Sequence, residues 1–450
     1  MILATKTLKK LGDNHYLSIN TISYTVIMVK RRYIILSLLL LIAINVSAGD
    51  TLRVMQYNLL YYDMNTSWCT SVNNNVNQKD TYLRTITSFY KPDIFTVNEM
   101  NGSVSSVNRI IDNVFNVDGS TNYQRANYTG SYLVNMLYYN TNKLALKSQT
   151  HVLTSPRITD VYRLYYKSEE LIHGDTIFLT CIVTHLKAGN SSSDAATRAQ
   201  SALQIMNHID KYNIDDNILF MGDFNVYTSS EAAFQSFISP TNSGVKLYDP
   251  VDAIGHWNNN SYYAKYHTQS THTSGDCHSG GGMDDRFDFI LASKAIMERN
   301  SGLGYVADTY WALGQDGKRF NQSLISPTNT SLPSYVLNAL YNMSDHLPVT
   351  LKLYVEANPL LSSGINSTDR SSIRIQNPID NTISIWSEYD KPEEVEIMLF
   401  NQLGSIILRN KSTLLPNEKH SISAAGLASG IYILSVQSSN ISYISKVIKR

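Results

Sequence analysis

The sequence predicts a mixed α/β (α+β) fold over most of the chain, followed by a small all-β domain. Between residues 51 and 355, apolar runs of strand length alternate with stretches of helical spacing, a mixture that is typical of layered folds. Beyond residue 371, short alternating strands are separated by turn signals about every 8–12 residues, which is typical of a β-sandwich. The chain of 450 residues is 43% hydrophobic, enough material for large cores in two or three domains.

Strands of the α/β part are expected where apolar residues follow one another. These segments are 52–60, 93–100, 133–140, 177–186, 217–225, 286–293 and 348–355. Helical spacing of the apolar residues predicts helices at 81–90, 103–115 and 194–212. Most of the strands are apolar at successive positions, so we expect both of their faces to be buried between layers.

The N-terminal segment has the pattern of a secretory signal peptide. Basic residues at 30–32 precede an apolar run, which ends in small residues up to Ala48. The alternative is a transmembrane anchor, but the apolar core of roughly 12 residues is short for a span that needs about 20. We therefore predict a signal peptide at 1–48, with Met28 as an alternative start, and a secreted or cell-surface protein.

The rest of the chain is predicted to form an α/β domain at 49–356 and a β-sandwich at 372–450. Residues 357–371 between them are rich in Ser, Asn and Gly and show no apolar periodicity, which predicts a linker. An exported protein can form disulfides. Cys181 lies in an apolar strand pattern and is expected to be a buried thiol, whereas Cys69 and Cys277 lie in polar loops, and the sequence leaves open whether these two are bridged.

Polar residues stand at or near the ends of most predicted strands. They are Asn58, Glu99, His185, Asp223, Asn225, Asp288, Asp345 and His346. Each of them alone has an ordinary structural explanation, since an Asp after a strand is usually a turn or helix cap. Ligands of layered sheets gather at strand ends, so a set of this size predicts one common site.

The residue types in this set suit phosphodiester hydrolysis. Hard divalent cations such as Mg²⁺ need oxygen ligands, which Glu99 and Asp345 can supply. Asp223 can orient or deprotonate a water, and the two histidines can offer protons or hydrogen bonds to phosphate oxygens. The two asparagines add neutral amides that orient a substrate without adding charge.

Six motifs resemble, in this order, those of the endonuclease/exonuclease/phosphatase superfamily. They are "MQYN", "NEM", "THLKAG", "MGDFN", "DDRFDFIL" and "SDHLPV", and the resemblance covers residues 51–355. It implies a four-layered α/β sandwich with two packed mixed β-sheets. It also implies a hydrolase of phosphate esters that uses Mg²⁺, or alternatively Mn²⁺ or Ca²⁺.

The resemblance also implies roles for individual residues. Catalytic roles are expected for His185, Asp223, Asn225, Asp288 and His346. Metal binding is expected for Glu99, Asn58 and Asp345. The arginine and tyrosine that repair nucleases place on the phosphate have no clear counterpart in this sequence.

Two further residues are candidates for substrate binding, each with a structural alternative. Asn135 lies in a strand whose residues could instead belong to the core, and Arg198 could face the phosphate or form an ordinary helix salt bridge. The segment 267–286 is rich in Gly, Ser and His and is expected to be a long loop at the site mouth. A second metal site involving His272, Asp276 or His278 is the alternative for this loop.

The C-terminal segment resembles the type A sorting domain of type IX secretion substrates. The resemblance rests on "NPIDNTISI", "LFNQLGSII", "LASGIYILSV" and the basic ending "SKVIKR". It implies recognition by the type IX secretion machinery. A generic cell-surface or carbohydrate-binding sandwich is the alternative.

These observations predict a secreted, metal-dependent phosphodiesterase, in the first place a nuclease acting on extracellular DNA or RNA as a monomer. Lys and Arg balance Asp and Glu at 37 each, so we do not expect strong non-specific binding to nucleic acid. One alternative is a sphingomyelinase-like lipid phosphodiesterase or a phosphatase; the lipid enzyme would use the aromatic segment 301–314 to enter lipid. A non-catalytic surface binding protein is the alternative of another class.

Overall fold

A computed structural model describes residues 50–167, 176–241, 243–299, 301–356, 373–387, 390–401, 405–438 and 442–450. The predicted signal peptide at 1–48 and the predicted linker at 357–371 lie outside these ranges. Among the described residues, no helix combines the length and apolar character needed to cross a membrane.

Two mixed β-sheets form the centre of the α/β part. The first has the strand order β11-β13-β1-β2-β4-β3, with β12 paired to β13. Its strands are β1 (Thr51–Tyr62), β2 (Ile94–Met100), β3 (Tyr123–Arg125), β4 (Val134–Asn140), β11 (Leu303–Tyr305), β12 (Trp311–Ala312) and β13 (Val349–Val355). The second, in the order β5-β6-β7-β8-β10-β9, comprises β5 (Leu144–Val152), β6 (Thr159–Tyr166), β7 (Phe178–His185), β8 (Ile218–Asp223), β9 (Leu247–Tyr248) and β10 (Asp288–Ser293).

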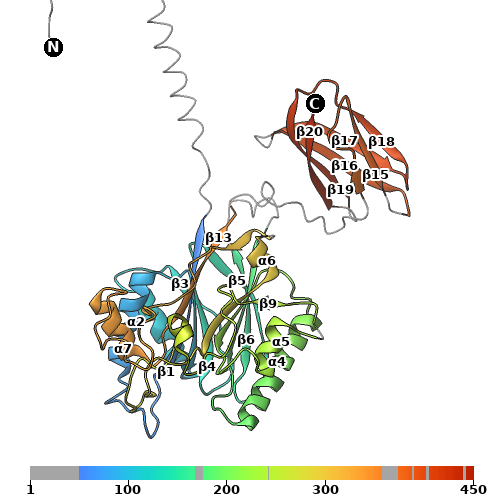
Figure 1. Cartoon of the computed structure of the whole chain (residues 1–450). Helices are drawn as coiled ribbons and strands as arrows, with labels where there is room; N and C mark the ends of the chain where they lie inside the picture. Colours follow the sequence, from blue (N-terminus) through green and yellow to red (C-terminus); the bar gives the residue numbers. More distant parts are fainter. Residues whose placement is uncertain are drawn as a thin grey trace, which may run out of the picture. The chain divides into compact units, whose positions relative to one another are not determined.

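Helices cover the outer face of each sheet (Figure 1). On the first sheet lie α2 (Val76–Tyr90), α3 (Val104–Ile110), the π-helix η1 (Ile111–Phe115) and α7 (Ser334–Met343). On the second lie α4 (Ser192–Lys211) and α5 (Ala232–Ile238). The short helices η3 (Ser261–Tyr266) and α6 (Lys294–Glu298) lie in the connections before and after β10. The predicted four-layered sandwich is confirmed.

Local sequence explains where the main helices begin. The Asn75 side chain accepts hydrogen bonds from the N–H groups of Asn77 and Gln78, so α2 starts five residues before the predicted 81–90. Ser191 and Asp194 form a reciprocal capping box that starts α4. The predicted helix 103–115 is present, but its second half is π-helical.

The two sheets pack on each other through a continuous apolar layer. Val54 and Leu351 of the first sheet and Leu219 and Ile290 of the second belong to this cluster of fully buried side chains. Outer clusters join the helices to the sheets, for example Leu83 of α2 on the first sheet. Because each central strand packs on a sheet at one face and on helices at the other, its sequence is apolar at successive positions, as expected.

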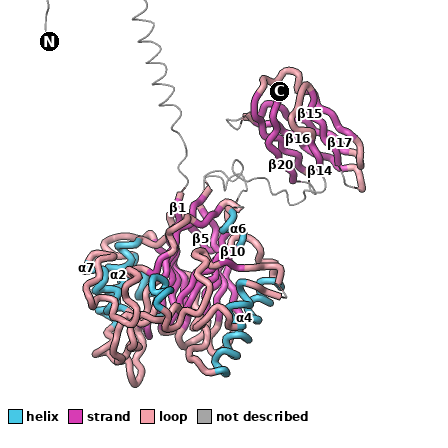
Figure 2. The backbone as a smooth tube through the Cα atoms, in the orientation of Figure 1, coloured by secondary structure: helices cyan, strands magenta, loops and turns pink. Residues whose placement is uncertain are grey.

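The C-terminal part is all-β, as predicted (Figure 2). A three-stranded sheet contains β14 (Ile373–Ile375), β15 (Thr382–Ser387) and β18 (Lys419–Ser423). A four-stranded sheet contains β16 (Glu393–Phe400), β17 (Ile406–Leu414), β19 (Gly430–Gln437) and β20 (Ser442–Lys449). Both sheets are antiparallel, and they share one core that includes Ile383, Ile397 and Leu434.

The topology brings the polar strand ends to one edge of the sandwich. Because β1 and β2 are parallel, Asn58 and Glu99 end at the same edge of the first sheet. Because β7 and β8 are parallel, His185 and Asp223 are register partners at the end of the second sheet. The antiparallel strand β10 begins there, with Asp288 opposite Asp223.

Candidate active site

Asp223 lies at the centre of the polar cluster formed by the strand ends. Its Oδ2 atom accepts a hydrogen bond from Nδ2 of Asn58 at 3.0 Å. The Nε2 atoms of His185 and His346 lie 3.5 Å and 3.9 Å from the same oxygen. One carboxylate oxygen therefore meets groups from three other segments of the chain.

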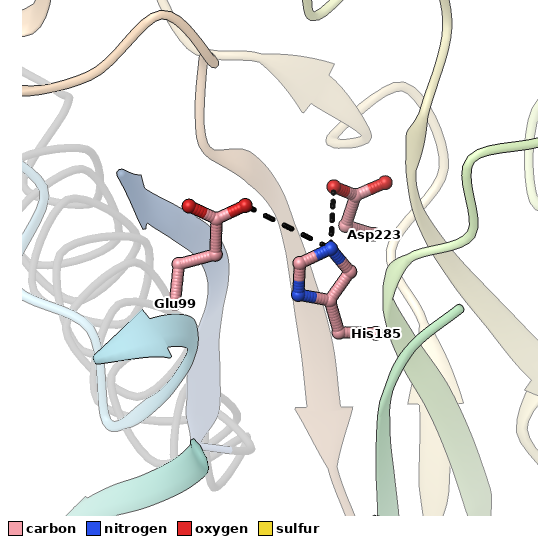
Figure 3. A group of neighbouring side chains, drawn as sticks. All are labelled: Glu99, His185 and Asp223. Atoms are coloured by element: carbon pink, nitrogen blue, oxygen red, sulfur yellow. Dashed lines mark ion pairs between the residues drawn. The ribbon is translucent and has the colours of Figure 1, made fainter. Parts of the chain in front are cut away.

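Glu99 faces the same cluster from the end of β2 (Figure 3). It accepts hydrogen bonds from the Asn58 side chain at 3.1 Å and from the Tyr61 N–H at 3.3 Å, and its Oε1 lies 3.8 Å from Nε2 of His185. The backbone of Glu99 has a φ of 58°, in the left-handed region that non-glycine residues rarely occupy. Strained backbone of this kind is held in place by surrounding structure and gathers at functional sites.

His346 and Asp288 form a buried ion pair. Nδ1 of His346 donates to Oδ2 of Asp288 at 2.7 Å. Burial opposes the charged imidazolium, but the Asp288 carboxylate outweighs it and raises the pKa of His346 well above its usual value. Asp223 and Asp345 add to this shift. These carboxylates favour the charged imidazolium of His346, whose Nε2 lies 3.9 Å from Oδ2 of Asp223.

His185 has the opposite character. Burial holds its pKa well below the usual value, and the charges of Arg157 and His346 lower it further. His185 is therefore a neutral imidazole at neutral pH. Its Nδ1 atom is buried and has no hydrogen-bond partner among the described residues.

The surroundings of Asp223 favour a carboxyl group that can exchange a proton near neutral pH. Burial raises its pKa to about 7; His346 opposes this shift, whereas Asp288 and Glu99 add to it. The backbone holds the residue in place, since its N–H donates to Oδ1 of Asn98 at 3.0 Å. This combination of burial and neighbouring charge is typical of functional carboxyl groups.

Asn225 and Asp345 lie at the border of the cluster. Asn225 has a φ of 51°, and its N–H donates to Oδ1 of Asp223 at 3.0 Å. Asp345 accepts a hydrogen bond from the Ser279 N–H at 2.9 Å through Oδ2. Its buried Oδ1 has no hydrogen-bond partner within the described parts of the chain.

The two predicted substrate-binding residues have internal partners instead. Asn135 is buried and donates to Oδ2 of Asp160 at 3.1 Å and to backbone carbonyls, while it accepts from Asn98. Arg198 is buried and paired with Glu231 at 2.8 Å, as in the salt-bridge alternative. The structure does not bring either side chain into the Asp223 cluster, and their contact with substrate stays a prediction.

Sequence reasoning missed several residues around the cluster. The Gln269 amide lies 2.7 Å from Nε2 of His346 and 3.3 Å from Oδ2 of Asp345. Arg157 lowers the pKa of His185 and donates to the Leu186 carbonyl at 3.0 Å, so a cation lies near His185. Gln269 lies in the segment predicted to form the mouth, whereas no local signal identifies Arg157.

Buried Lys79 supports the bend after Asn58. Its Nζ donates to the carbonyls of Leu59, at 2.8 Å, and Leu60. Leu60 and Tyr61 both have positive φ, so this contact stabilises an unusual turn. The turn aims the Tyr61 N–H at Glu99, so Lys79 acts on the site through the backbone.

The cluster has the composition of a site for a hard divalent cation. Glu99, His185 and Asp223 lie close enough to hold one ion, and so do Asp223, Asp288 and His346, although a protonated His346 offers no ligand atom to a metal. The unpartnered Oδ1 of Asp345 offers a further oxygen. A divalent cation would also offset the repulsion among these buried carboxylates, so the residues fit the predicted metal.

Two other loop predictions can be compared with the structure. Cys69 and Cys277 form a disulfide, and Cys181 is a buried free thiol. The aromatic segment 301–314 is packed: it contributes β11 and β12 to the first sheet, and Tyr310 is buried. It therefore presents no exposed apolar loop for entering lipid.

His272 and His278 stack on each other with ring centroids 3.5 Å apart.

Solved structures with similar folds include three at low sequence identity. The catalytic domain of human Nocturnin is 14% identical, with 68% of this chain and 97% of that chain covered and a TM-score of 0.41. TDP2 from D. rerio, complexed with single strand DNA product, is 12% identical, with 68% and 100% covered and a TM-score of 0.43. The endonuclease/exonuclease/phosphatase from Bacteroides vulgatus is 14% identical, with 68% and 100% covered and a TM-score of 0.40.

The C-terminal domain has a family match of its own. No curated protein matches the chain by sequence. Residues 377–450 match the family model of the secretion system C-terminal sorting domain, which indicates a secreted or cell-surface protein.

Proposed function

We propose that this protein is a secreted, Mg²⁺-dependent phosphodiesterase whose substrate is nucleic acid. The observation that carries the proposal is the set of contacts around Asp223. A carboxyl group with a pKa near neutrality lies between a neutral histidine and a charged one, beside the carboxylate of Glu99. Hydrolysis of a phosphate ester needs a base, a proton donor and a site for a cation, and the cluster supplies all three.

Each residue of the Asp223 cluster has its own role in the proposed reaction. Asp223 orients the attacking water and takes its proton, since its Oδ2 is the atom on which the other groups converge. His346, held as an imidazolium by Asp288, donates a hydrogen bond to the phosphate and stabilises its developing charge. Asn58 and Asn225 orient oxygens without adding charge. His185 is neutral and offers a second hydrogen bond.

Glu99, Asn58 and Asp345 would hold the cation. When bound, Mg²⁺ would stabilise negative charge on the phosphate and the leaving oxygen. Arg157 would neutralise further phosphate charge from the β6 side of the cluster. Nucleic acid is preferred over lipid because the aromatic segment 301–314 is packed into the first sheet.

A parallel assay of the purified protein tests this function. Single-stranded DNA, plasmid DNA, RNA, sphingomyelin and a small phosphomonoester are each incubated with Mg²⁺, and again with EDTA. We expect EDTA-sensitive cleavage of nucleic acid, which at limiting Mg²⁺ is strongly reduced in the variant Glu99→Gln. Cleavage of sphingomyelin alone, or of the monoester alone, would show that the substrate class is wrong. Nucleic-acid binding without turnover of any substrate would favour a binding protein.

A further inference from the structure

Trp68 is an exposed aromatic residue on a loop that is otherwise well bonded. Its side chain is 75% exposed. Its N–H donates to Oγ1 of Thr66 at 3.1 Å, and its carbonyl accepts from Nδ2 of Asn73 at 2.9 Å. The same Asn73 amide donates to Oδ1 of Asp276, in the long loop before β10, at 2.7 Å. The backbone of Trp68 is thus held on both sides while its indole ring stays in water.

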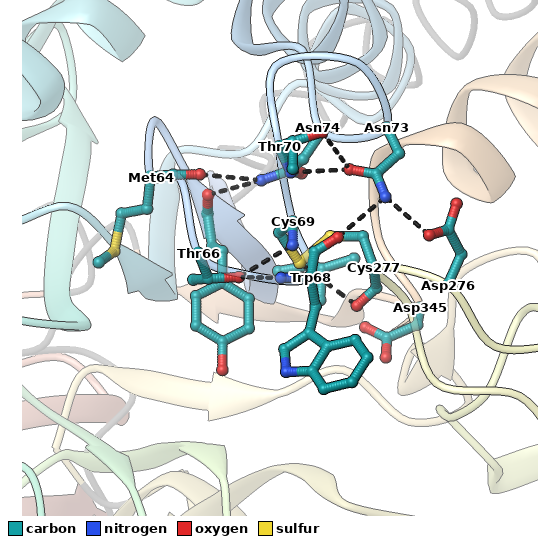
Figure 4. Close-up of a disulfide and its surroundings, with 12 residues drawn as sticks. Met64, Thr66, Trp68, Cys69, Thr70, Asn73, Asn74, Asp276, Cys277 and Asp345 are labelled. Carbon is teal, nitrogen blue, oxygen red and sulfur yellow. Dashed lines mark hydrogen bonds between the residues drawn. A yellow bond between two sulfur atoms is a disulfide. The ribbon is translucent and has the colours of Figure 1, made fainter.

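The loop of Trp68 is tied to the polar cluster (Figure 4). The neighbouring residue Cys69 is bridged to Cys277. Two residues further on, the Ser279 N–H donates to Oδ2 of Asp345 at 2.9 Å. A single exposed apolar side chain is ordinary on a protein surface. Here the exposed indole belongs to a residue whose backbone is held by hydrogen bonds and whose neighbour Cys69 is bridged to the loop that contacts Asp345, the residue before His346.

Aromatic side chains also border the cluster on the side of Glu99. The Tyr61 N–H donates to Oε2 of Glu99 at 3.3 Å. Tyr132 is 60% exposed, just before the start of β4.

We infer that Trp68 is a stacking platform for an unpaired base of a single-stranded nucleic acid whose phosphate lies in the Asp223 cluster. The inference rests on the proposed function and names its substrate class. Bases stack on exposed aromatic rings in proteins that bind single strands, with little dependence on sequence. A duplex offers no free base face, so single strands are the preferred substrate.

The composition of the loop favours a base over a lipid surface. Val72 is the other large apolar residue that the loop exposes, and the residues around these two are mainly Ser, Thr and Asn. A loop that enters hydrocarbon must satisfy its polar groups internally and present a continuous apolar surface. This loop presents one indole on a polar support.

The test compares Trp68→Ala, Trp68→Phe and the matched control Tyr212→Ala, which removes an exposed aromatic side chain near the opposite end of β8. Cleavage of a single-stranded oligonucleotide, its duplex and an abasic single strand of the same length is measured for each variant. We expect Trp68→Ala to raise KM for the single strand roughly 5- to 100-fold, the contribution of one stacked base. Trp68→Phe should restore most of the affinity, and the abasic strand and the control should change less than about two-fold.

A binding measurement separates this inference from the proposed function. Asp223→Asn, alone and combined with each Trp68 variant, is titrated with oligothymidine, and fluorescence quenching reports stacking. Quenching that depends on Trp68 without cleavage by the parent protein would support the platform and contradict the proposed function. Cleavage that is unchanged in Trp68→Ala would overturn the platform alone. If Trp68→Ala lost binding to sphingomyelin vesicles but bound the oligonucleotide as before, the loop would be a lipid-binding element instead.

Discussion

Asp223 shows how one side chain serves both the fold and the site. Its Oδ1 accepts the Asn225 N–H, which is the ordinary capping contact of an Asp after a strand. Its Oδ2 faces Asn58, His185 and His346. The capping explanation and the catalytic explanation of this residue are therefore compatible.

Asp223→Asn separates these two functions. The amide oxygen can still accept the Asn225 N–H, but an amide cannot take a proton from water. We expect kcat to fall by about 10²- to 10⁴-fold, the usual contribution of a general base, while Tm changes little. Steady-state kinetics and thermal unfolding of the same preparation check this. Loss of folding together with activity would restore the purely structural explanation.

Asp288→Asn tests the ion pair through the pH dependence. The Asp288 carboxylate raises the pKa of His346, so the imidazolium persists above its usual range. Without that carboxylate, the pKa of His346 falls and the imidazolium is lost at lower pH. The alkaline limb of kcat/KM should therefore move toward lower pH. Glu298→Gln, an exposed acid on α6, serves as the control, and a profile unchanged in Asp288→Asn would contradict the assigned role.

Glu99→Gln tests the cation site. The substitution keeps the shape of the side chain but removes one negative charge from the carboxylate cluster. We expect the Mg²⁺ concentration for half-maximal activity to rise at least about 10-fold, since even supporting residues of metal sites have effects of this size. Titration calorimetry with Mg²⁺ alone gives a readout independent of turnover. Equal Mg²⁺ affinity in both proteins would remove Glu99 from the metal site.

At the scale of elements, parallel strand pairs and two loops build the site. The pairs β1–β2 and β7–β8 bring four polar residues to one edge because their ends coincide. The long loop before β10 adds Gln269 and the Ser279 N–H. The disulfide between Cys69 and Cys277 fastens this loop to the loop after β1.

Cys69→Ser together with Cys277→Ser should lower stability and weaken the site. A disulfide that closes a long segment typically contributes about 2–4 kcal/mol to the free energy of unfolding. The freed loop would hold the Ser279 N–H less firmly against Asp345, so kcat/KM should also fall. Chemical denaturation and kinetics of the double variant test this, with the buried Cys181→Ala variant as a control for thiol removal. If the kinetics of the double variant were unchanged, the disulfide would contribute to stability but not to the activity of the site.

At the scale of the molecule, the α/β part and the sorting domain each have their own core. We expect a chain ending at residue 356 to retain phosphodiesterase activity, because the described contacts of the Asp223 cluster all come from residues before β13. In a host with type IX export, the shortened chain should be missing from the medium and active in the cell lysate. Equal amounts in the medium would show that residues 377–450 are not the export signal.

Several features of the molecule could be predicted from the sequence alone. The central strands at 93–100, 133–140 and 217–225 were expected within a residue or two of β2, β4 and β8, because buried strands are apolar at successive positions. The partly exposed strand β5 and the two-residue strands β9 and β12 have no such pattern and were not predicted. The helix α7 was also missed.

The sequence by itself determined which residue types stand at the strand ends, and hence the chemistry available. Only the tertiary structure decided which of them meet. Asp288 and His346 are 58 residues apart, and Cys69 and Cys277 are 208 apart, so no local pattern specifies either pairing. Asn135 and Arg198 carry suitable side chains, but packing gives them internal partners. Neighbouring residues along the chain determine where strands and helix caps form. Pairing between distant segments depends instead on how both sheets pack around a common core.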